Sequence, residues 1–227
     1  HPLERPAAID RLLRRPEHGL LEPVPQGLGL QPAARLGPAA ADIDVTVKGL
    51  ELPMHDPRAY VCMAANYATG NRGACHLEAM AHWRGAAGLK MDGLWTPEPY
   101  DSHASPGQGK MAAIWQNYLA VFNPLGLCKF VIRGPVDPQQ VCDWMRMALG
   151  WEISPAELLR IGERIFNLKR LINMRLGVSA QDDTLPGRLL TLPRKTGGAA
   201  GILPDQEMQL REYYAERGWN SNGVPLP

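Results

Sequence analysis

Two short segments combine small residues with a side chain that could do chemistry. The first is Tyr67–His76, with the sequence YATGNRGACH. Its glycines and alanines would let the backbone approach another group closely, and the histidine that ends it can exchange a proton near neutral pH. The alternative is a tight turn into a helix with a structural histidine in the core. Residue types alone favour this alternative.

The second segment is Asn123–Cys128, with the sequence NPLGLC. Its cysteine follows a glycine break and could present one thiolate to a metal. Equally, the segment could be the end of a helix with a buried, inert cysteine, and the residue types again favour this interpretation. The other cysteines are Cys62, Cys75 and Cys142. No two of the four have C-x-x-C spacing, which excludes a zinc knuckle and a thioredoxin motif. Four scattered cysteines are also too few for a disulfide scaffold in a chain of this length.

The elements that must position these segments are mostly helical. Apolar residues recur at spacings of three and four between Met111 and Phe122, just before the second segment. Capping signals predict two more helices, and a glycine C-cap marks the end of a last one. They run from Asp137 to Gly150, from Ser154 to Gly177, and over roughly Pro204 to Arg217, before Gly218. The second of these carries apolar residues on one face: Leu158, Ile161, Ile165, Leu168, Ile172 and Leu176.

One strand signal precedes the helices. Ile43, Val45 and Val47 alternate with polar residues until Pro53 and the turn at His55–Pro57. Residues 22–41 are rich in Pro, Gly and Ala, so we interpret 1–41 as a divergent arm or linker and 42–227 as one helical domain. The sequence therefore predicts an all-α (multihelical) fold with a minor strand element.

Composition narrows the possible functions. Lys and Arg number 24 against 23 Asp and Glu, which excludes a strongly basic nucleic-acid binder. Apolar types make up 45 % of the residues, which is enough for a core. The sequence contains no run of about 18 apolar residues, so we expect no transmembrane helix. The first 20 residues lack the apolar stretch of a secretory signal. We expect a cytoplasmic protein with no nucleic-acid or membrane partner.

Six motifs in one order resemble the C-terminal helical domain of the tungsten-containing aldehyde ferredoxin oxidoreductase family. The resemblance runs from about Asp44 to the C-terminus, and the ordered set is far more specific than any single motif. The motifs are LELPMHDPR (50–58), YATGNRGACHL (67–77), GLCKF (126–130), GERIFNLKRLIN (162–173), DDTLPGRLL (182–190) and YYAERGW (213–219).

The resemblance implies a function in oxidation of aldehydes to carboxylic acids. The family does this at a tungsten or molybdenum ion held by two pterins, and electrons leave through a [4Fe-4S] cluster to ferredoxin. The expected partners are thus an N-terminal pterin-binding domain or subunit, ferredoxin and the aldehyde. Both cofactors would need that N-terminal region, which includes the C-x-x-C-x-x-x-C cluster motif missing from this sequence.

Four residues take roles from the resemblance. His76 matches the active-site histidine beside the metal, and Cys128 matches the fourth cysteine ligand of the cluster. Asn123 and Leu127 lie in the segment D-x-x-G-L-C, which contacts a pterin. Asn123 replaces the family's aspartate, so one acceptor is lost and two donors are gained there.

The remaining motif residues are interpreted as scaffold. We expect Cys62, Cys75 and Cys142 in the core, a structural turn at Asp56–Arg58, and structural roles for the helix at 162–173 and the turn at 182–186. His82 and His103 lie outside the signature, so their replacement should leave activity nearly unchanged.

Two other functions stay open. The chain could be a truncated, non-catalytic helical interaction module, which Asn123 favours modestly. It could also belong to a relative that acts as an aromatic thioester reductase. An adjacent reading frame for the pterin domain would favour the oxidoreductase.

Overall fold

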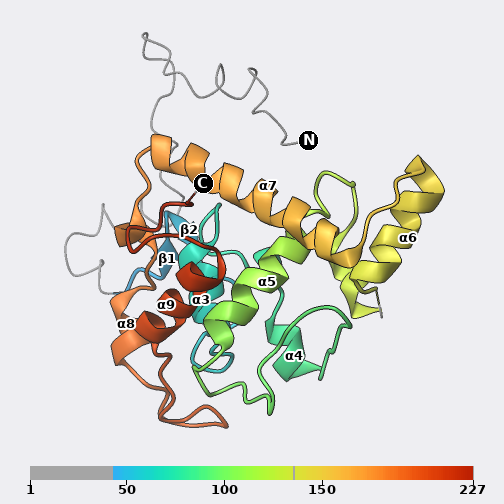
Figure 1. Cartoon of the computed structure of the whole chain (residues 1–227). Coiled ribbons are helices and arrows are strands. Elements are labelled where there is room, and N and C mark those ends of the chain that lie inside the picture. The colour runs from blue at the N-terminus through green and yellow to red at the C-terminus, as the bar shows by residue number, and fades with distance from the viewer. Residues whose placement is uncertain (1–42, 135, 227) are drawn as a thin grey trace.

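The computed structural model describes residues 43–134 and 136–226. In these residues seven α-helices and three short 3₁₀-helices accompany one two-stranded sheet, which confirms the predicted all-α fold with a minor strand element (Figure 1). The predicted arm, residues 1–41, lies outside the described residues. The elements are β1 (Thr46–Val47), β2 (Leu50–Glu51), α3 (Met63–Thr69), η2 (His76–Glu78), α4 (His82–Ala86), α5 (Gln108–Ala120), η3 (Lys129–Arg133), α6 (Pro138–Leu149), α7 (Pro155–Arg175), η4 (Ala180–Asp182), α8 (Gly187–Thr191) and α9 (Gln206–Glu216).

The strand signal produces only a short hairpin. β1 and β2 pair antiparallel with Val47 opposite Leu50, and the turn between them has positive φ at Lys48 (50°) and Gly49 (77°). This is the backbone shape that a two-residue hairpin turn needs. Val47 is buried, but Ile43 at the start of the alternating pattern is 62 % exposed. The strand is thus shorter than the alternating pattern from Ile43 predicts, because β1 and β2 pair over only two residues each.

α5 is the centre of the fold. It packs most extensively against α7 and α9 and also against α3, and Figure 1 shows α7 crossing beyond one end of it. Its aromatic side chains Trp115 and Tyr118 are almost wholly buried. The helix predicted from Met111 to Phe122 is confirmed, with ends shifted to Gln108 and Ala120. Large apolar side chains on its faces account for this central position.

Local capping signals fix the next two helices. Asp137 caps α6 by accepting a hydrogen bond from the Gln140 N–H at 2.8 Å. Ser154 and Glu157 form a reciprocal capping box at the start of α7. Gly150 ends α6 with φ of 68°, a conformation that favours glycine. The predicted boundaries of both helices are therefore confirmed.

The buried row of α7 coincides only in part with its predicted apolar face. The helix buries a row with a spacing of four: Leu158, Gly162, Phe166 and Arg170. Leu168, Ile172 and Leu176, on the face that carries the apolar stripe, are 40–48 % exposed. Gly162 brings the α7 backbone against α5, since a Cβ there would lie 1.8 Å from the Asn117 carbonyl oxygen. The α7–α5 contact is thus made through this glycine together with the first part of the stripe, since Leu158 is fully buried and Ile161 and Ile165 pack against the core.

Replacing Gly162 by alanine should destabilise the protein by about 1–3 kcal/mol, because two packed helices would have to separate. This cost should exceed the gain of about 1 kcal/mol that alanine brings within a helix. Gly187→Ala in α8 is the matched control, since a Cβ there meets nothing within 4 Å. Urea unfolding of both variants measures the difference. Equal midpoints for the two would show that the α5–α7 contact is not tight.

α9 completes the other side of α5. The Glu212 carboxylate accepts hydrogen bonds from the Gly107 N–H (2.8 Å) and the Gly109 N–H (3.1 Å) at the start of α5. Arg217, just after α9, donates to the Asn117 side chain at 2.7 Å. The first-turn N–H groups of a helix have no acceptor within the helix. Glu212 supplies that acceptor for α5 from a distant part of the chain.

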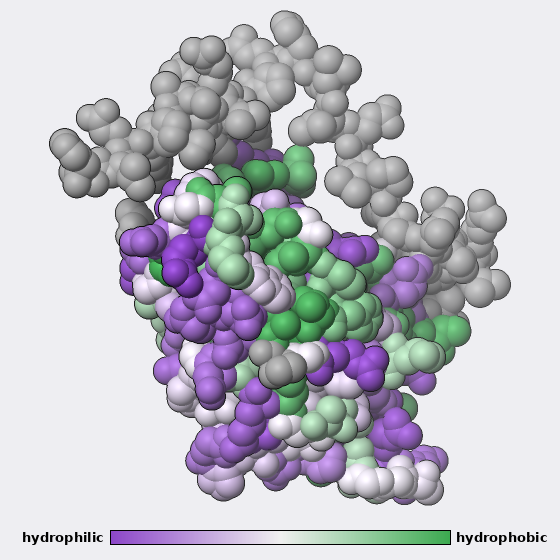
Figure 2. All heavy atoms as spheres, turned by 90° about the vertical axis from the view of Figure 1, so that its right-hand side faces the viewer, coloured by the Kyte–Doolittle hydropathy of each residue, from purple (hydrophilic) through white to green (hydrophobic). Residues whose placement is uncertain are grey.

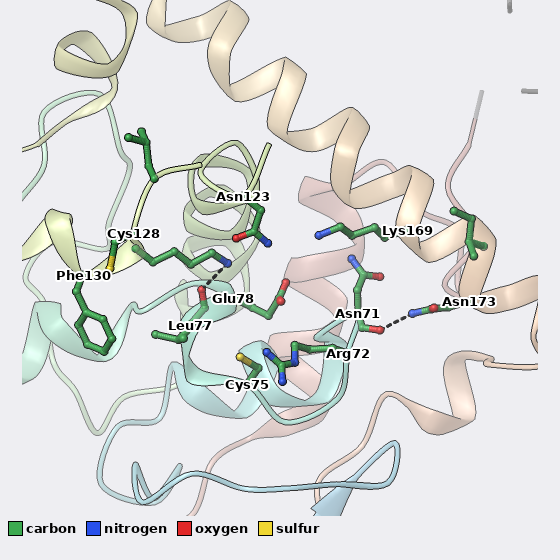
Figure 3. A pocket seen from close by; sticks show the side chains of 13 residues that line it. Asn71, Arg72, Cys75, Leu77, Glu78, Asn123, Cys128, Phe130, Lys169 and Asn173 are labelled. Carbon is green, nitrogen blue, oxygen red and sulfur yellow. Dashed lines mark hydrogen bonds between the residues drawn. The ribbon is translucent and has the colours of Figure 1, made fainter. Parts of the chain in front are cut away.

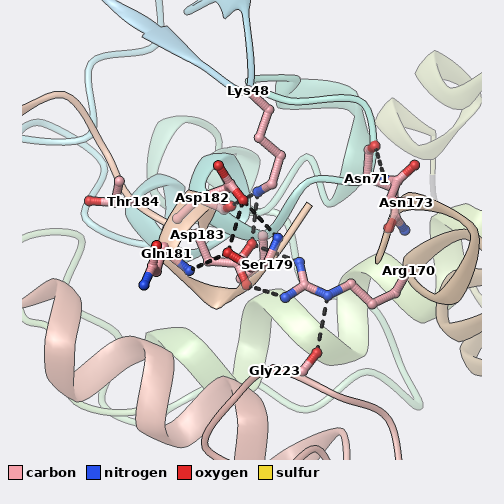
Figure 4. A network of polar contacts seen from close by, with 12 residues as sticks. Lys48, Asn71, Arg170, Asn173, Ser179, Gln181, Asp182, Asp183, Thr184 and Gly223 are labelled. Carbon is pink, nitrogen blue, oxygen red and sulfur yellow. Dashed lines mark hydrogen bonds and ion pairs between the residues drawn. The ribbon is translucent and has the colours of Figure 1, made fainter. Parts of the chain in front are cut away.

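A buried ionic network joins the hairpin, α7 and the chain near Gly223 (Figure 4). Arg170 donates to both Asp183 oxygens at 2.8–2.9 Å and to the Gly223 carbonyl at 3.1 Å. Lys48 lies 2.8 Å from Asp183, and the Tyr214 hydroxyl donates to the same carboxylate at 2.6 Å. Burial lowers the pKa of Lys48 despite this partner. The network confirms a structural role for the turn at 182–186.

The surface carries several exposed apolar side chains. Figure 2 shows one face on which apolar side chains gather into a band. Among the large exposed side chains are Phe130 (47 %), Met147 (71 %) and Trp151 (55 %), in addition to those of α7. Within the described residues, no helix combines the length and hydropathy that a bilayer crossing requires.

Candidate functional site

A cavity of about 510 Å³ lies where three segments meet (Figure 3). These are the turn and 3₁₀-helix at 71–78, the chain after α5 at 123–130, and one face of α7. The cavity brings together three of the four predicted site residues, Asn123, Leu127 and Cys128. His76 is not among its lining residues, although its neighbours Cys75 and Leu77 are.

The turn after α5 presents Cys128 to solvent. The Leu127 N–H donates to the Phe122 carbonyl at 2.9 Å, and the Gly126 N–H donates to the Asn123 carbonyl at 3.1 Å. Gly126 has φ of 68°, which the turn requires and a glycine adopts without strain. Cys128 is exposed, so the alternative of a buried, inert cysteine is wrong. An exposed thiol at a cavity can serve as a ligand.

Three helices hold the turn at 70–75 against the cavity. Asn66, which is fully buried in α3, donates to the Cys75 carbonyl at 3.0 Å, and Asn173 of α7 donates to the Asn71 carbonyl. Gln116 of α5 in turn donates to the Asn66 side chain at 3.3 Å. The cavity wall is therefore fixed by polar contacts from the core.

The small residues of this turn serve its own packing. A Cβ at Gly73 would lie 2.5 Å from the Val47 carbonyl oxygen, and one at Gly70 would lie 2.4 Å from the Gly73 carbonyl oxygen. Gly73 also has φ of 94°. The predicted close approach of the backbone therefore occurs. Gly73 approaches the β1–β2 hairpin, and Gly70 approaches another residue of the same turn.

The cavity wall is predominantly cationic. Arg72, Lys129 and Lys169 line it, and Glu78 is the one acidic residue among the lining side chains. Lys129 donates to the Leu77 carbonyl at 2.9 Å, and burial lowers the pKa of its amine. The Asn71 Oδ1 atom is buried without a hydrogen-bond partner. Such a wall suits an anionic group that also offers a donor.

His76 packs instead against two other histidines. Its ring centroid lies 4.8 Å from that of His55 and 5.9 Å from that of His82. His55 and His82 stack at 4.1 Å with an angle of 26° between their planes. The three rings come from the chain before α3, from η2 and from α4. We call them the histidine cluster.

The histidine cluster is held uncharged by its surroundings. His82 is 2 % exposed, and neither of its ring nitrogens has a hydrogen-bond partner. Burial, with smaller effects of His55 and His76, lowers the pKa of His82 to about 3. Burial also lowers the pKa of His55, and burial together with His55 lowers that of His76. His76 is therefore a neutral imidazole at pH 7, able to accept a proton.

The stability of the protein should fall as the pH drops below 7. An unfolded histidine binds a proton near pH 6.5, whereas folded His82 does so only near pH 3. Between these values the unfolded state binds more protons, so the free energy of unfolding rises with pH. His82 should contribute a loss of about 2 kcal/mol between pH 7 and pH 5. Urea unfolding at both pH values should show this loss in the parent and a smaller one in His82→Phe. Equal losses would contradict it.

Other predictions for this region have mixed outcomes. Cys62, Cys75 and Cys142 are buried as predicted, but Cys75 also lines the cavity. The structural turn is confirmed, because Arg58 binds the Asp56 carboxylate at 2.8 Å and the Leu192 carbonyl at 2.7 Å.

The helix at 162–173, interpreted as scaffold, also contributes to the cavity wall. Lys169, Ile172 and Asn173 of this helix line the cavity. Two polar residues four apart, with an isoleucine between them, were the available signal for a second functional face. His55 and His82 carried no such signal, since neither has a spacing to His76 that predicts contact.

The described residues contain no group of three or more His, Cys, Asp or Glu side chains that could hold a metal ion. Cys128 offers a single thiolate, while a cubane iron–sulfur cluster takes four cysteine ligands. Among the described residues, Cys128 could therefore supply one ligand of such a cluster and not a complete set.

The family model and the curated relatives that match this chain point to the same family. The model of aldehyde ferredoxin oxidoreductase domains 2 and 3 matches residues 27–227, beginning within the segment that we interpret as a linker. The chain is similar to tungsten-containing aldehyde ferredoxin oxidoreductases of Pyrococcus furiosus (36 % identity), Thermococcus kodakarensis (35 %) and Pyrococcus abyssi (36 %). These matches cover 78–80 % of this chain and 28–29 % of the relatives. The chain thus spans less than a third of their length.

One solved structure has a similar fold. It is the active-site complex BamBC of benzoyl coenzyme A reductase in complex with 1,5-dienoyl-CoA, with a TM-score of 0.59. The likeness covers 87 % of this chain and 34 % of that one at 17 % identity. At this identity it shows a shared fold alone.

Proposed function

Because the chain belongs to the family of aldehyde ferredoxin oxidoreductase domains 2 and 3, we propose that it forms the C-terminal part of a cytoplasmic tungsten- or molybdenum-pterin oxidoreductase. In this function an aldehyde is oxidised to a carboxylic acid, and the electrons pass to ferredoxin. The observation that carries the proposal is the meeting of Cys128, Leu127 and Asn123 at one cationic cavity.

Cys128 would hold one iron of a [4Fe-4S] cluster. Its thiol is exposed beside the cavity, and the cations Arg72, Lys129 and Lys169 favour the negative charge of a thiolate-ligated cluster. The cluster, when bound, would supply one-electron transfer. Lys129 keeps its amine on the Leu77 carbonyl, which fixes the chain directly after Cys128. The chain's own contribution is thus a ligand and a rigid, positively charged wall.

Asn123 and Leu127 would contact a pterin at the same cavity. Asn123 is exposed, so its amide is free to turn either its oxygen or its nitrogen toward a ligand. An amide accepts with one oxygen where a carboxylate accepts with two. We therefore propose that the pterin is held here with fewer bonds from this segment, and that Asn71, whose Oδ1 has no partner, offers a further acceptor.

His76 would act beside the metal as a proton acceptor or hydrogen-bond partner of the aldehyde oxygen. Burial keeps its imidazole neutral at pH 7, so it can take a proton that is released during oxidation.

The proposal requires a pterin-binding domain or subunit as partner. The exposed stripe Leu168, Ile172 and Leu176 on α7 supports this, because Ile172 also lines the cavity. A partner that covered this stripe would bury apolar surface and reach the cavity at the same time. Ferredoxin would be the electron acceptor of the assembled enzyme.

Replacing Cys128 by serine in the assembled protein should abolish or strongly weaken the paramagnetic signal of the cluster. A serine oxygen is a poorer ligand for iron than a thiolate. Electron paramagnetic resonance of the reduced protein and iron content per chain measure the effect.

Cys62→Ser and Cys142→Ser are the matched controls. Burial raises the pKa of the Cys62 thiol to about 12 and also raises that of Cys142, so neither is a thiolate at pH 7. Neither residue lines the cavity. A parental signal in Cys128→Ser would assign the ligand to another residue and remove the support for the proposed function.

A second candidate function is a non-catalytic helical interaction module. Asn123 in place of aspartate and the exposed apolar stripe on α7 favour it. In that case the chain would bind its partner equally well with serine at position 128. The third possibility is that the chain belongs to an aromatic thioester reductase. Only the shared fold supports it.

A further inference from the structure

The histidine cluster contains two residues to which no role has been given. His55 lies between the other two rings, with centroid distances of 4.8 Å to His76 and 4.1 Å to His82. The stack of His55 on His82 is nearly parallel, whereas His76 meets His55 at 58°. Removing either His55 or His82 would therefore free a surface against which the His76 ring is packed, directly or through its neighbour.

The position of His55 is itself fixed. The Tyr67 hydroxyl, from buried α3, donates to the His55 carbonyl at 3.0 Å. On the far side of the stack, Tyr60 meets His82 edge-on at 6.1 Å, and Trp83 lies 5.6 Å from it. The cluster is thus a set of packed rings in which His82 is buried and His55 and His76 are partly exposed.

No carboxylate compensates a charge on this cluster. Among the hydrogen bonds and ion pairs of the described residues, none involves a ring nitrogen of His55, His76 or His82. The nearest acid in sequence, Asp56, is bound by Arg58 at 2.8 Å and by Arg194 at 3.3 Å. The rings of Tyr60 and Trp83 pack on His82, and Arg133 lies over the Trp83 ring at 4.7 Å to its centroid. The charged residue nearest to His76 along its own element is Glu78. A proton on one ring would therefore have no hydrogen-bonded or ion-paired carboxylate to stabilise it.

The His82 ring is buried with two unpartnered nitrogens, which costs stability. Its contacts are ring packing, on His55 at 4.1 Å and edge-on to His76 at 5.9 Å. We propose that His55 and His82 are positioning residues that hold the His76 ring in one orientation as a neutral imidazole. This inference rests on the proposed role of His76 in the active site.

The test is an NMR titration of the 227-residue chain without cofactor, from pH 4 to pH 8. The ¹³C–¹H resonances of the histidine rings report each protonation midpoint, and ¹⁵N shifts report the tautomer. In the parent, His76 should titrate below the ordinary imidazole value of about 6.5 and show one tautomer. His55→Ala should move its midpoint up toward that value and mix the tautomers, because water replaces the packed ring.

Further variants separate packing from other effects. His82→Ala should move the His76 midpoint in the same direction by a smaller amount, since it acts through His55. His82→Phe keeps a ring in the stack and should leave the His76 midpoint and tautomer near the parent. His103→Ala, outside the cluster, should change nothing at His76. Circular dichroism confirms that each variant is folded, and the phenylalanine variant keeps the test available if an alanine variant unfolds.

An unchanged His76 midpoint and tautomer in folded His55→Ala and His82→Ala would overturn the inference. This outcome is distinct from failure of the proposed function. If His76→Ala retained full turnover in a complete enzyme while the titration behaved as expected, the active-site role would fail and the positioning would stand. If the titration failed and His76→Ala was inactive, the reverse would hold.

Discussion

Replacing His76 by alanine in a complete enzyme should lower aldehyde oxidation by about 10²–10⁴-fold, the range for a positioned acid–base group. The imidazole is neutral at pH 7 and packs on His55, so in the proposed function it could accept a proton during oxidation. Turnover with a viologen acceptor, normalised to bound metal, measures the effect. Metal content should be unchanged, because His76 is not expected to be a ligand.

The control for this experiment follows from the histidine cluster. His82 seemed a neutral position from sequence, but its ring lies 5.9 Å from that of His76 and stacks on His55. His103→Ala is the appropriate control, since it lies outside the cluster. Near-parental turnover of His76→Ala would return this residue to a structural role.

Replacing Asp183 by asparagine should destabilise the protein by about 3–5 kcal/mol. The side chain is fully buried, and its charge balances Arg170 and Lys48, which are 1 % and 8 % exposed. Asparagine has nearly the same shape, so the loss would come from two buried cations without a counter-charge. Urea unfolding at pH 7 gives the free energy.

The matched control is Asp143→Asn. Asp143 pairs with Arg146 at 3.6 Å on the exposed side of α6, where an ion pair contributes about 0–1 kcal/mol. A loss below 1 kcal/mol in Asp183→Asn as well would show that water reaches the Arg170–Asp183 pair.

Features set by neighbours in sequence were predicted well. The caps at Asp137 and Ser154 and the glycine ends of the helices need only a few adjacent residues, and they appear where the sequence placed them. The cavity was predicted in part. The segment at 123–128 was identified through its cysteine and its motif, and the structure places three of its residues on one wall.

Features set by contacts between distant segments were missed. The buried face of α7 contains Gly162 and Arg170, which have no apolar side chain to reveal it. Gly162 is buried because the Asn117 backbone lies against it, and Arg170 is buried because Asp183 neutralises it. Neither partner can be found from periodicity. The same reason hid Lys169 and Asn173 on the cavity wall, since their relation to Cys128 exists only in three dimensions.

The bond from Glu212 to the start of α5 has a consequence for synthesis of the chain. Glu212 follows its partners Gly107 and Gly109 by 103–105 residues, a stretch that a ribosome makes in about 5–20 s. During that time the first turn of α5 has no cap, and the side of the helix that α9 later covers is open to water. The residues on that side are small, Ala112 and Ala113, and they meet Tyr213 only when α9 has been made. Trp115 and Tyr118 pack instead in the main core, whose residues all precede α9. The central helix of this fold is thus buried on one side early and completed on the other side late.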